Sequence, residues 1–357
     1  LDLVSQKQQY VAPETETQHG LSQIWQEILE LDEVGLNDHF FRLGGHSLIA
    51  AQMISKVRDQ FNVPLPVKAI FDYPTLLTLA NYIETLQAGI EAQYDSVITL
   101  QASGEETPIF CVHGIGGGVM NFMDLAQAMG SEQPFYGIQA QGFDGQQPPL
   151  YVLDEMVERY VADIQRLQPQ GPYRLMGYSM GGWLVMQIAA ILQATGEDIQ
   201  SLVILDSLPP KKAEESGDDL LNLWLLDVAI LIEEQTGDDW SLEPESLVGL
   251  SAEDCVTAVL DDLRRKYPML AEAEDMQNII AIHAANHYAM HHASLLEFDG
   301  DVALAVASFG VLTADDVASW QDFVSGSVTR YDVAGDHDNM LSDPTFDDLI
   351  QILQEIV

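Results

Sequence analysis

The sequence predicts two domains: a small all-α bundle of four helices, then an α/β domain with a mainly parallel sheet and an inserted helical lid. Three observations support this fold class. Residues 19 to 88 show helical periodicity without strands, short apolar runs alternate with helical patterns after Pro108, and helical pattern alone occupies about 209 to 296. The chain, at 357 residues, is also longer than one domain of roughly 100 to 200 residues.

The helical domain is expected to span residues 19 to 88. Residues 1 to 18 are polar and include Pro13, as is typical of a linker. Apolar residues then recur at helical spacing in three segments, 21–31, 47–61 and 75–86. Short helices of this kind predict a small bundle.

The α/β domain is expected to span residues 97 to 357. Residues 89 to 106 form a polar connection that includes a first edge strand at Val97–Leu100. Short apolar runs predict further strands at 109–112, 135–138, 173–176, 202–205, 302–307 and 328–333. We interpret about residues 209 to 275, which interrupt this alternation, as the lid.

The strongest motif is Gly177-Tyr178-Ser179-Met180-Gly181, between a predicted strand and an apolar helix. This is the context of a nucleophile elbow, in which a strained turn exposes a serine above the sheet and leaves no room for side chains at the flanking glycines. An ordinary glycine-rich turn with a helix-capping serine is the alternative. The context favours Ser179 as a catalytic nucleophile.

A serine needs a base and an orienting carboxylate. His337 lies on the loop after the last predicted strand, where the base of this chain order belongs. Asp206 ends the strand 202–205 and so shares the carboxyl edge of the sheet with Ser179. The alternative acid is Asp315 or Asp316, after the strand 302–307. Two acids on the His337 loop, Asp336 and Asp338, are too close in sequence to orient its ring.

The segment from His113 to Gly118, His-Gly-Ile-Gly-Gly-Gly, follows another predicted strand. It predicts an oxyanion-hole loop, with the backbone N–H groups of Ile115 and Met180 as donors. A phosphate-binding loop is the weaker alternative, because no Lys-Ser or Lys-Thr follows the glycines.

Ser47 begins a predicted helix directly after Gly44-Gly45-His46. An N-cap serine is the simple interpretation. The alternative, favoured by Asp38-His39-Phe40-Phe41 just upstream, is a serine that carries a phosphodiester-linked group at a helix N-terminus.

Three histidines, His283, His287 and His291, recur every four residues, and His292 adjoins them. They would share one helical face, which is a possible metal site. We predict no metal, because no carboxylate or cysteine joins them at ligand spacing. We expect these rings to pack near the lid or to line the substrate path.

Composition narrows the function classes. Fifty-six acidic residues against fourteen basic ones give a formal charge of −42, which disfavours nucleic acid and anionic membranes as partners. No apolar run approaches the roughly 20 residues that span a bilayer. Two distant cysteines, Cys111 and Cys255, form no disulfide framework, so we expect a cytoplasmic protein. The first residue is not Met, and we expect a piece of a longer polypeptide.

Two stretches resemble a known family. Residues 38 to 48, Asp-His-Phe-Phe-Arg-Leu-Gly-Gly-His-Ser-Leu, resemble the attachment motif of peptidyl carrier domains in nonribosomal peptide synthetases, although Arg42 stands where the family often has an acid. Residues 97 to 357 resemble the type I thioesterase that ends such synthetases, an α/β-hydrolase fold. The resemblance spans nearly the whole chain. It places the family's acid at Asp206, which favours Asp206 over Asp315.

The resemblance implies a function. A phosphopantetheinyl transferase would attach 4'-phosphopantetheine to Ser47, upstream condensation and adenylation domains would load a peptidyl thioester, and Ser179 would release the peptide by hydrolysis or macrocyclisation. We expect a bacterial cytoplasmic enzyme whose carrier docks through Leu48, Ile49 and Met53. Two alternatives are an editing thioesterase that removes misprimed acyl groups and a non-catalytic carrier-binding module of the same fold.

Overall fold

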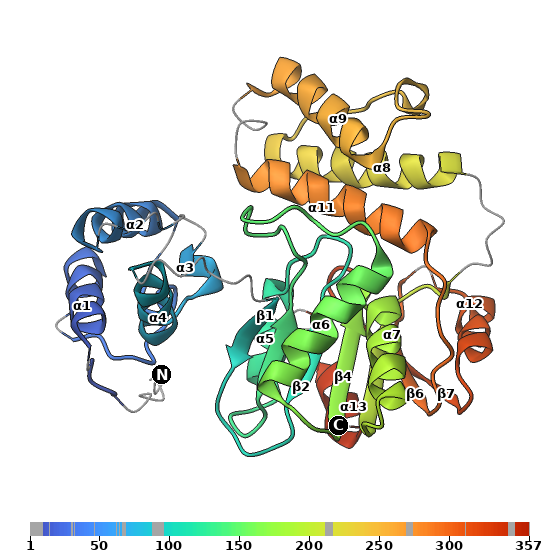
Figure 1. The fold of residues 1–357 in the computed structure, drawn as a ribbon, viewed down its shortest axis with the longest axis horizontal. Helices are drawn as coiled ribbons and strands as arrows, with labels where there is room; N and C mark the ends of the chain where they lie inside the picture. The colour runs from blue at the N-terminus through green and yellow to red at the C-terminus, as the bar shows by residue number, and fades with distance from the viewer. Residues whose placement is uncertain are drawn as a thin grey trace. The chain divides into compact units, whose positions relative to one another are not determined.

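The computed structural model describes residues 10–13, 15–29, 31, 33–45, 47–61, 63, 65, 69–87, 96–210, 217–268, 274–310, 312–341 and 347–356. The chain divides into two compact units after Tyr94, and Figure 1 shows the elements of each.

The first unit is helical, as predicted. Its helices are α1 (Glu16–Leu29), α2 (Ser47–Phe61), the short α3 (Ala69–Asp72) and α4 (Leu76–Gln87). Their apolar faces share one core, in which the fully buried rings of Trp25 and Phe40 meet edge to face with centroids 5.1 Å apart. Packing of amphipathic faces stabilises helices as short as these.

Helix α1 begins at Glu16, earlier than the predicted domain start at residue 19. The reason is a capping box that the sequence interpretation overlooked. The Thr15 hydroxyl accepts a hydrogen bond from the Gln18 N–H at 3.2 Å, and the Gln18 side chain accepts one from the Thr15 N–H at 3.2 Å. These reciprocal bonds satisfy N–H groups that a helix start leaves unpaired.

The second unit contains a seven-stranded sheet in the order β1-β3-β2-β4-β5-β6-β7. Strand β1 pairs antiparallel with β3, and the other pairs are parallel. Every predicted strand is present. The bounds are β1 (Val97–Gln101), β2 (Ile109–Val112), β3 (Phe135–Ile138), β4 (Tyr173–Tyr178), β5 (Ile199–Leu205), β6 (Val302–Ala307) and β7 (Val328–Val333).

Helices cover both faces of this sheet, which explains why its central strands are mostly apolar. One core cluster joins the sheet to α6 (Leu153–Leu167) and α7 (Gly181–Ala194), and another joins it to α5 (Met123–Ala128) and α13 (Asp347–Ile356). All residues of β4 and β6 are buried. The remaining short helices are η1 (Met120–Phe122), α12 (Ala314–Ser319) and η3 (Trp320–Phe323).

The predicted lid segment contains helices and no strand among its described residues. It contains α8 (Gly217–Thr236), η2 (Pro244–Ser246) and α9 (Ala252–Lys266), and α11 (Glu274–His291) follows. These helices lie above the carboxyl ends of the strands in Figure 1 and share a core of their own. Helix α11 also packs on the core of the sheet through Ala289.

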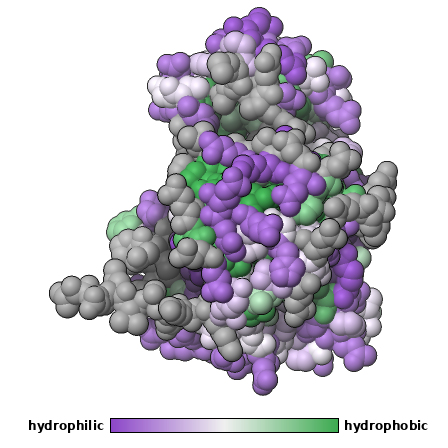
Figure 2. Space-filling model, turned by 90° about the vertical axis from the view of Figure 1, so that its left-hand side faces the viewer, coloured by the Kyte–Doolittle hydropathy of each residue, from purple (hydrophilic) through white to green (hydrophobic). Residues whose placement is uncertain are grey.

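None of the described helices combines the length and the apolar composition that a membrane crossing requires. Hydrophilic residues cover much of the described surface in Figure 2, as the charge of −42 leads one to expect.

Candidate active site

The turn between β4 and α7 holds Ser179 in a left-handed backbone conformation, with φ of +54°. A side chain at Gly177 would overlap the Gly181 carbonyl, and a Cβ at Gly181 would lie 2.5 Å from the Val112 carbonyl oxygen. Both glycines are therefore required, as the elbow motif predicted. The turn places Ser179 at the carboxyl edge of the sheet.

His337 and Asp206 meet at the same edge, although 131 residues separate them. The His337 Nδ1 and the Asp206 Oδ2 lie 2.7 Å apart. The other Asp206 oxygen accepts a hydrogen bond from the Ala307 N–H at 2.9 Å, and the Asp206 side chain is fully buried. A buried carboxylate bonded in this way fixes the ring and its tautomer.

The alternative acids have other partners. The Asp316 side chain closes a capping box with Thr313 at the start of α12, and Asp315 is exposed in the same first turn. Asp336 accepts hydrogen bonds from the backbone N–H groups of Asp338 and Asn339, within its own loop. Among the described acids, only Asp206 is hydrogen-bonded to His337.

Tyr178 supports His337 in two ways that the sequence did not indicate. Its ring stacks on the His337 ring with centroids 4.9 Å apart, and its hydroxyl donates to the His337 carbonyl at 2.6 Å. Burial, helped by nearby Asp338, raises the pKa of Tyr178, so the hydroxyl keeps its proton for this bond.

The predicted oxyanion loop lies next to Ser179. A Cβ at Gly114 would sit 3.4 Å from the Ser179 Cβ. Within the described part of the chain, neither the Ile115 N–H nor the Met180 N–H has a hydrogen-bond acceptor, so both are available to a substrate oxygen. From α11, the fully buried Asn286 donates to the Ile115 carbonyl at 2.7 Å and holds this loop.

His113, which begins the loop, is structural. Its ring is fully buried and bonds the Tyr160 hydroxyl at 2.8 Å and the Gly114 carbonyl at 2.7 Å. Burial lowers the pKa of His113 to about 4, so the ring is neutral near pH 7.

One cavity of about 760 Å³ collects these groups. Its lining includes Ser179, Met180, His337, the loop 114–118, and residues of α8 and α11. Its described lining contains no Lys or Arg.

Two of the aligned histidines line this cavity, together with a carboxylate that the sequence interpretation missed. The Asp227 carboxylate, from α8, lies 2.7 Å from His287 Nε2 and 3.3 Å from His283 Nδ1. Burial alone would raise the pKa of Asp227, but the bonds from His283 and His287 outweigh it and lower the pKa to about 2. We predicted no metal because no carboxylate or cysteine joins the histidines at ligand spacing in the sequence, but Asp227 reaches them from another helix.

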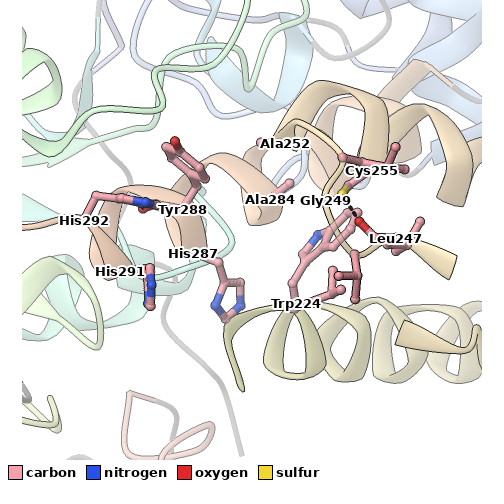
Figure 3. A pocket seen from close by; sticks show the side chains of 13 residues that line it. Trp224, Leu247, Gly249, Ala252, Cys255, Ala284, His287, Tyr288, His291 and His292 are labelled. Carbon is pink, nitrogen blue, oxygen red and sulfur yellow. Dashed lines mark hydrogen bonds between the residues drawn. The ribbon is translucent and has the colours of Figure 1, made fainter. Parts of the chain in front are cut away.

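A smaller cavity of about 310 Å³ lies among α8, α9 and α11 (Figure 3). His287 lines both cavities, while His291 and His292 line only the smaller one. The Trp224 indole N–H beside it has no hydrogen-bond partner among the described residues. The expectation that the histidines lie near the lid is confirmed.

In the first unit, Ser47 is the first residue of α2. Gly44 before it has φ of +101°, and the first turn of α2 contains no acidic residue. The prediction that this unit docks through Leu48, Ile49 and Met53 is wrong for Met53. Met53 is fully buried in the core of its own unit and is not available to a partner.

Each of the two units matches a known protein family. Residues 107–357 match the family described as "Thioesterase domain", and residues 19–83 match "Phosphopantetheine attachment site". A chondramide synthase from Chondromyces crocatus is 30% identical over 354 residues, covering 96% of this chain and 9% of that protein. The chain thus corresponds to a small part of that relative.

Two solved structures are similar to the chain. The first is a four-domain nonribosomal peptide synthetase bound to AMP and glycine. The alignment covers 100% of this chain and 27% of the synthetase chain, with a TM-score of 0.60 and 25% sequence identity. The second is the NocB thioesterase domain in a covalent complex with a fluorophosphonate nocardicin G analogue. The alignment covers 73% of this chain and 98% of the NocB domain chain, with a TM-score of 0.53 and 19% sequence identity. This second likeness concerns the α/β-hydrolase fold.

Proposed function

This chain belongs to the thioesterase domain family and carries a phosphopantetheine attachment domain, and from that premise we propose that it releases a peptide held as a thioester on Ser47. Ser179 takes over the peptidyl group, and hydrolysis or macrocyclisation completes release. The 2.7 Å hydrogen bond between His337 and Asp206, beside the cavity that contains Ser179, is the observation that carries this proposal.

The start of α2 suits the attached group. The N-terminal N–H groups of a helix and its dipole stabilise an anion such as a phosphodiester, and the first turn of α2 has no acid to oppose it. Phosphopantetheine on Ser47 supplies a thiol that carries the peptide as a thioester.

His337 is the proposed general base. Its Nδ1–H donates to Asp206, which leaves Nε2 to take the proton of the Ser179 hydroxyl. The Ser179 Oγ then forms a bond to the carbonyl carbon of the thioester, and the carbonyl oxygen becomes negatively charged.

The Ile115 and Met180 N–H groups are the proposed donors to that oxygen. Removing one such donor in a serine hydrolase costs about 10²- to 10³-fold in rate. When the tetrahedral intermediate collapses, the C–S bond breaks and the thiolate receives the proton from His337. An ester on Ser179 remains.

The second half-reaction uses the same residues. Water, or an amine or hydroxyl group of the peptide, gives its proton to His337 and attacks the ester carbonyl. The Ser179 Oγ leaves and regains its proton. Water gives a free acid, and an internal nucleophile gives a ring.

The proposal extends to partners and location. We expect upstream condensation and adenylation domains to supply the peptide and a phosphopantetheinyl transferase to modify Ser47. We also expect the enzyme to work in a bacterial cytoplasm.

Turnover of soluble pantetheine thioesters tests the proposal. Peptidyl thioesters should be released, Ser179→Ala should abolish release, and Ser103→Ala, at an exposed serine, should leave it unchanged. Fast turnover of short acyl groups with poor turnover of peptidyl groups would favour the editing alternative. No turnover of any thioester by the folded chain would favour the non-catalytic one.

A further inference from the structure

Besides Ser179 and His337, the cavity is lined by a second group of side chains able to act together. Asp227 of α8 and His283 and His287 of α11 each offer one ligand atom, and these atoms all lie within 4.8 Å of one another. No other such group of three occurs in the part of the chain that the structure describes. We propose that Asp227, His283 and His287 together bind one divalent cation of the zinc class.

The ligand types and their spacing suit zinc. Two imidazole nitrogens and one carboxylate oxygen are common zinc ligands, and two histidines four residues apart on a helix present their rings on one face. Zinc at about 2.0 to 2.1 Å from tetrahedral ligands holds those ligands roughly 3.3 Å apart. The Asp227 oxygen lies 2.7 Å from His287 Nε2 and 3.3 Å from His283 Nδ1, and all three ligand atoms lie within 4.8 Å of one another, so the three ligands are already gathered around one point.

The charge of the surroundings favours a cation. Asp227 offers a carboxylate oxygen, and each imidazole can hold a proton on the nitrogen that does not face the ion. Asp338 adds a second carboxylate to the cavity, whose described lining contains no Lys or Arg. A divalent cation thus meets attraction and no competing positive side chain.

The position of this set gives the ion a structural consequence. Figure 3 shows His287 projecting from α11 toward α8, the helix that carries Asp227. Asn286, next to His287, holds the Ile115 carbonyl. A bound ion would therefore connect the lid helix to the helix that supports the oxyanion loop. Its remaining coordination positions would be open to water or to a substrate oxygen in the cavity.

Metal binding to the full chain tests this proposal without any assay of thioesterase activity. Chain with unmodified Ser47 is used, so that no added thiol competes for the ion. We expect one Zn²⁺ per chain after dialysis, and one equivalent of Co²⁺ to give the visible absorption of tetrahedral cobalt. Zn²⁺ should also raise the thermal unfolding midpoint of the second unit.

Variants locate the ion. His287→Ala and Asp227→Asn should each weaken binding by about tenfold or more, since one of three ligands is lost. Two control variants should bind the ion as tightly as the wild type. They are His291→Ala, one turn further along α11, and His337→Ala, which removes the histidine next to Asp206. Circular dichroism checks the fold of each variant.

Three results would overturn the proposal. The first is no stoichiometric binding of Zn²⁺ or Co²⁺ by the folded chain. The second is binding that survives both His287→Ala and Asp227→Asn. The third is binding lost in His337→Ala but kept in His287→Ala, which would assign the ion to the Asp206–His337 pair. Thioester turnover, measured separately, stays a test of the proposed function alone.

Discussion

The Asn286 side chain donates a hydrogen bond to the Ile115 carbonyl oxygen at 2.7 Å, although 171 residues separate the two in the chain. Asn286 is 1% exposed, and Ile115 carries one of the two proposed oxyanion donors. The bond therefore joins α11, which packs on the lid helix α8, to the loop that carries this proposed donor. A residue that acts through Ile115 in this way is a positioning residue.

Replacing Asn286 should slow chemistry more than it weakens binding. Asn286→Leu removes the donor and leaves the loop less well held, so we expect kcat for a peptidyl thioester to fall by about 10- to 100-fold with little change in KM. Asn278→Leu, at a half-buried asparagine of the same helix, should change neither value. A rise in KM with unchanged kcat would show that Asn286 serves substrate binding instead.

The identity of the acid can be tested by isosteric substitution. Asp206→Asn keeps an oxygen for the Ala307 N–H but presents no carboxylate to His337, and we expect kcat to fall by as much as about 10⁴-fold, the size of this effect in other serine hydrolases. Asp315→Asn, at an exposed position, should retain full activity. The opposite pattern would move the acid to α12.

The two serines should be separable in function. Ser47→Ala should prevent the mass gain produced by a phosphopantetheinyl transferase and coenzyme A, while soluble thioesters are still turned over. Ser179→Ala should gain that mass but lose turnover. Mass gain on a peptide other than the one that contains Ser47 would remove the carrier assignment.

Buried His113 predicts loss of stability in acid. Its pKa is lowered to about 4 in the fold, against about 6.5 in the unfolded chain. The unfolded chain therefore takes up a proton first as pH falls. The contribution of neutral His113 to the free energy of unfolding is fully present above about pH 6.5. It decreases by about 3 kcal/mol in total as the pH falls to about 4.

Thermal unfolding of the second unit between pH 7 and pH 4 measures this effect. His113→Asn should be less stable than the wild type at pH 7, because the hydrogen bond to Tyr160 is disturbed. Its unfolding midpoint should fall less than that of the wild type between pH 7 and pH 4. Equal losses in the wild type and the variant would contradict a neutral His113 in the fold. An NMR titration of the ring offers an independent check.

Local patterns made most of the fold predictable. Strands β2 and β6 are short apolar runs that are buried throughout, as burial on both faces of the sheet requires. The elbow around Ser179 was also evident, because its glycines are needed sterically and their spacing is fixed. The start of α1 was missed although Thr15 and Gln18 have capping-box spacing, since no apolar repeat marks that end.

Contacts between distant helices were not predictable in the same way. Asp227 meets His283 and His287 across two helices, and nothing in the periodicity of either helix indicates which faces will meet. The contacts of Asn286 and Tyr178 were equally hard to predict, because each side chain bonds a backbone carbonyl more than 150 residues away in the sequence. Such partners follow from the packing of the lid and the sheet, which sequence order does not fix.

Transfer of the peptide within one chain tests the central claim most directly. Ser47 is loaded with a peptidyl-phosphopantetheine group, the reaction is quenched at short times, and the peptides containing Ser47 and Ser179 are followed by mass. We predict that acyl mass leaves Ser47, appears transiently on Ser179, and stays on Ser47 in Ser179→Ala. Loss of the acyl group from Ser47 at the same rate in Ser179→Ala would contradict the account.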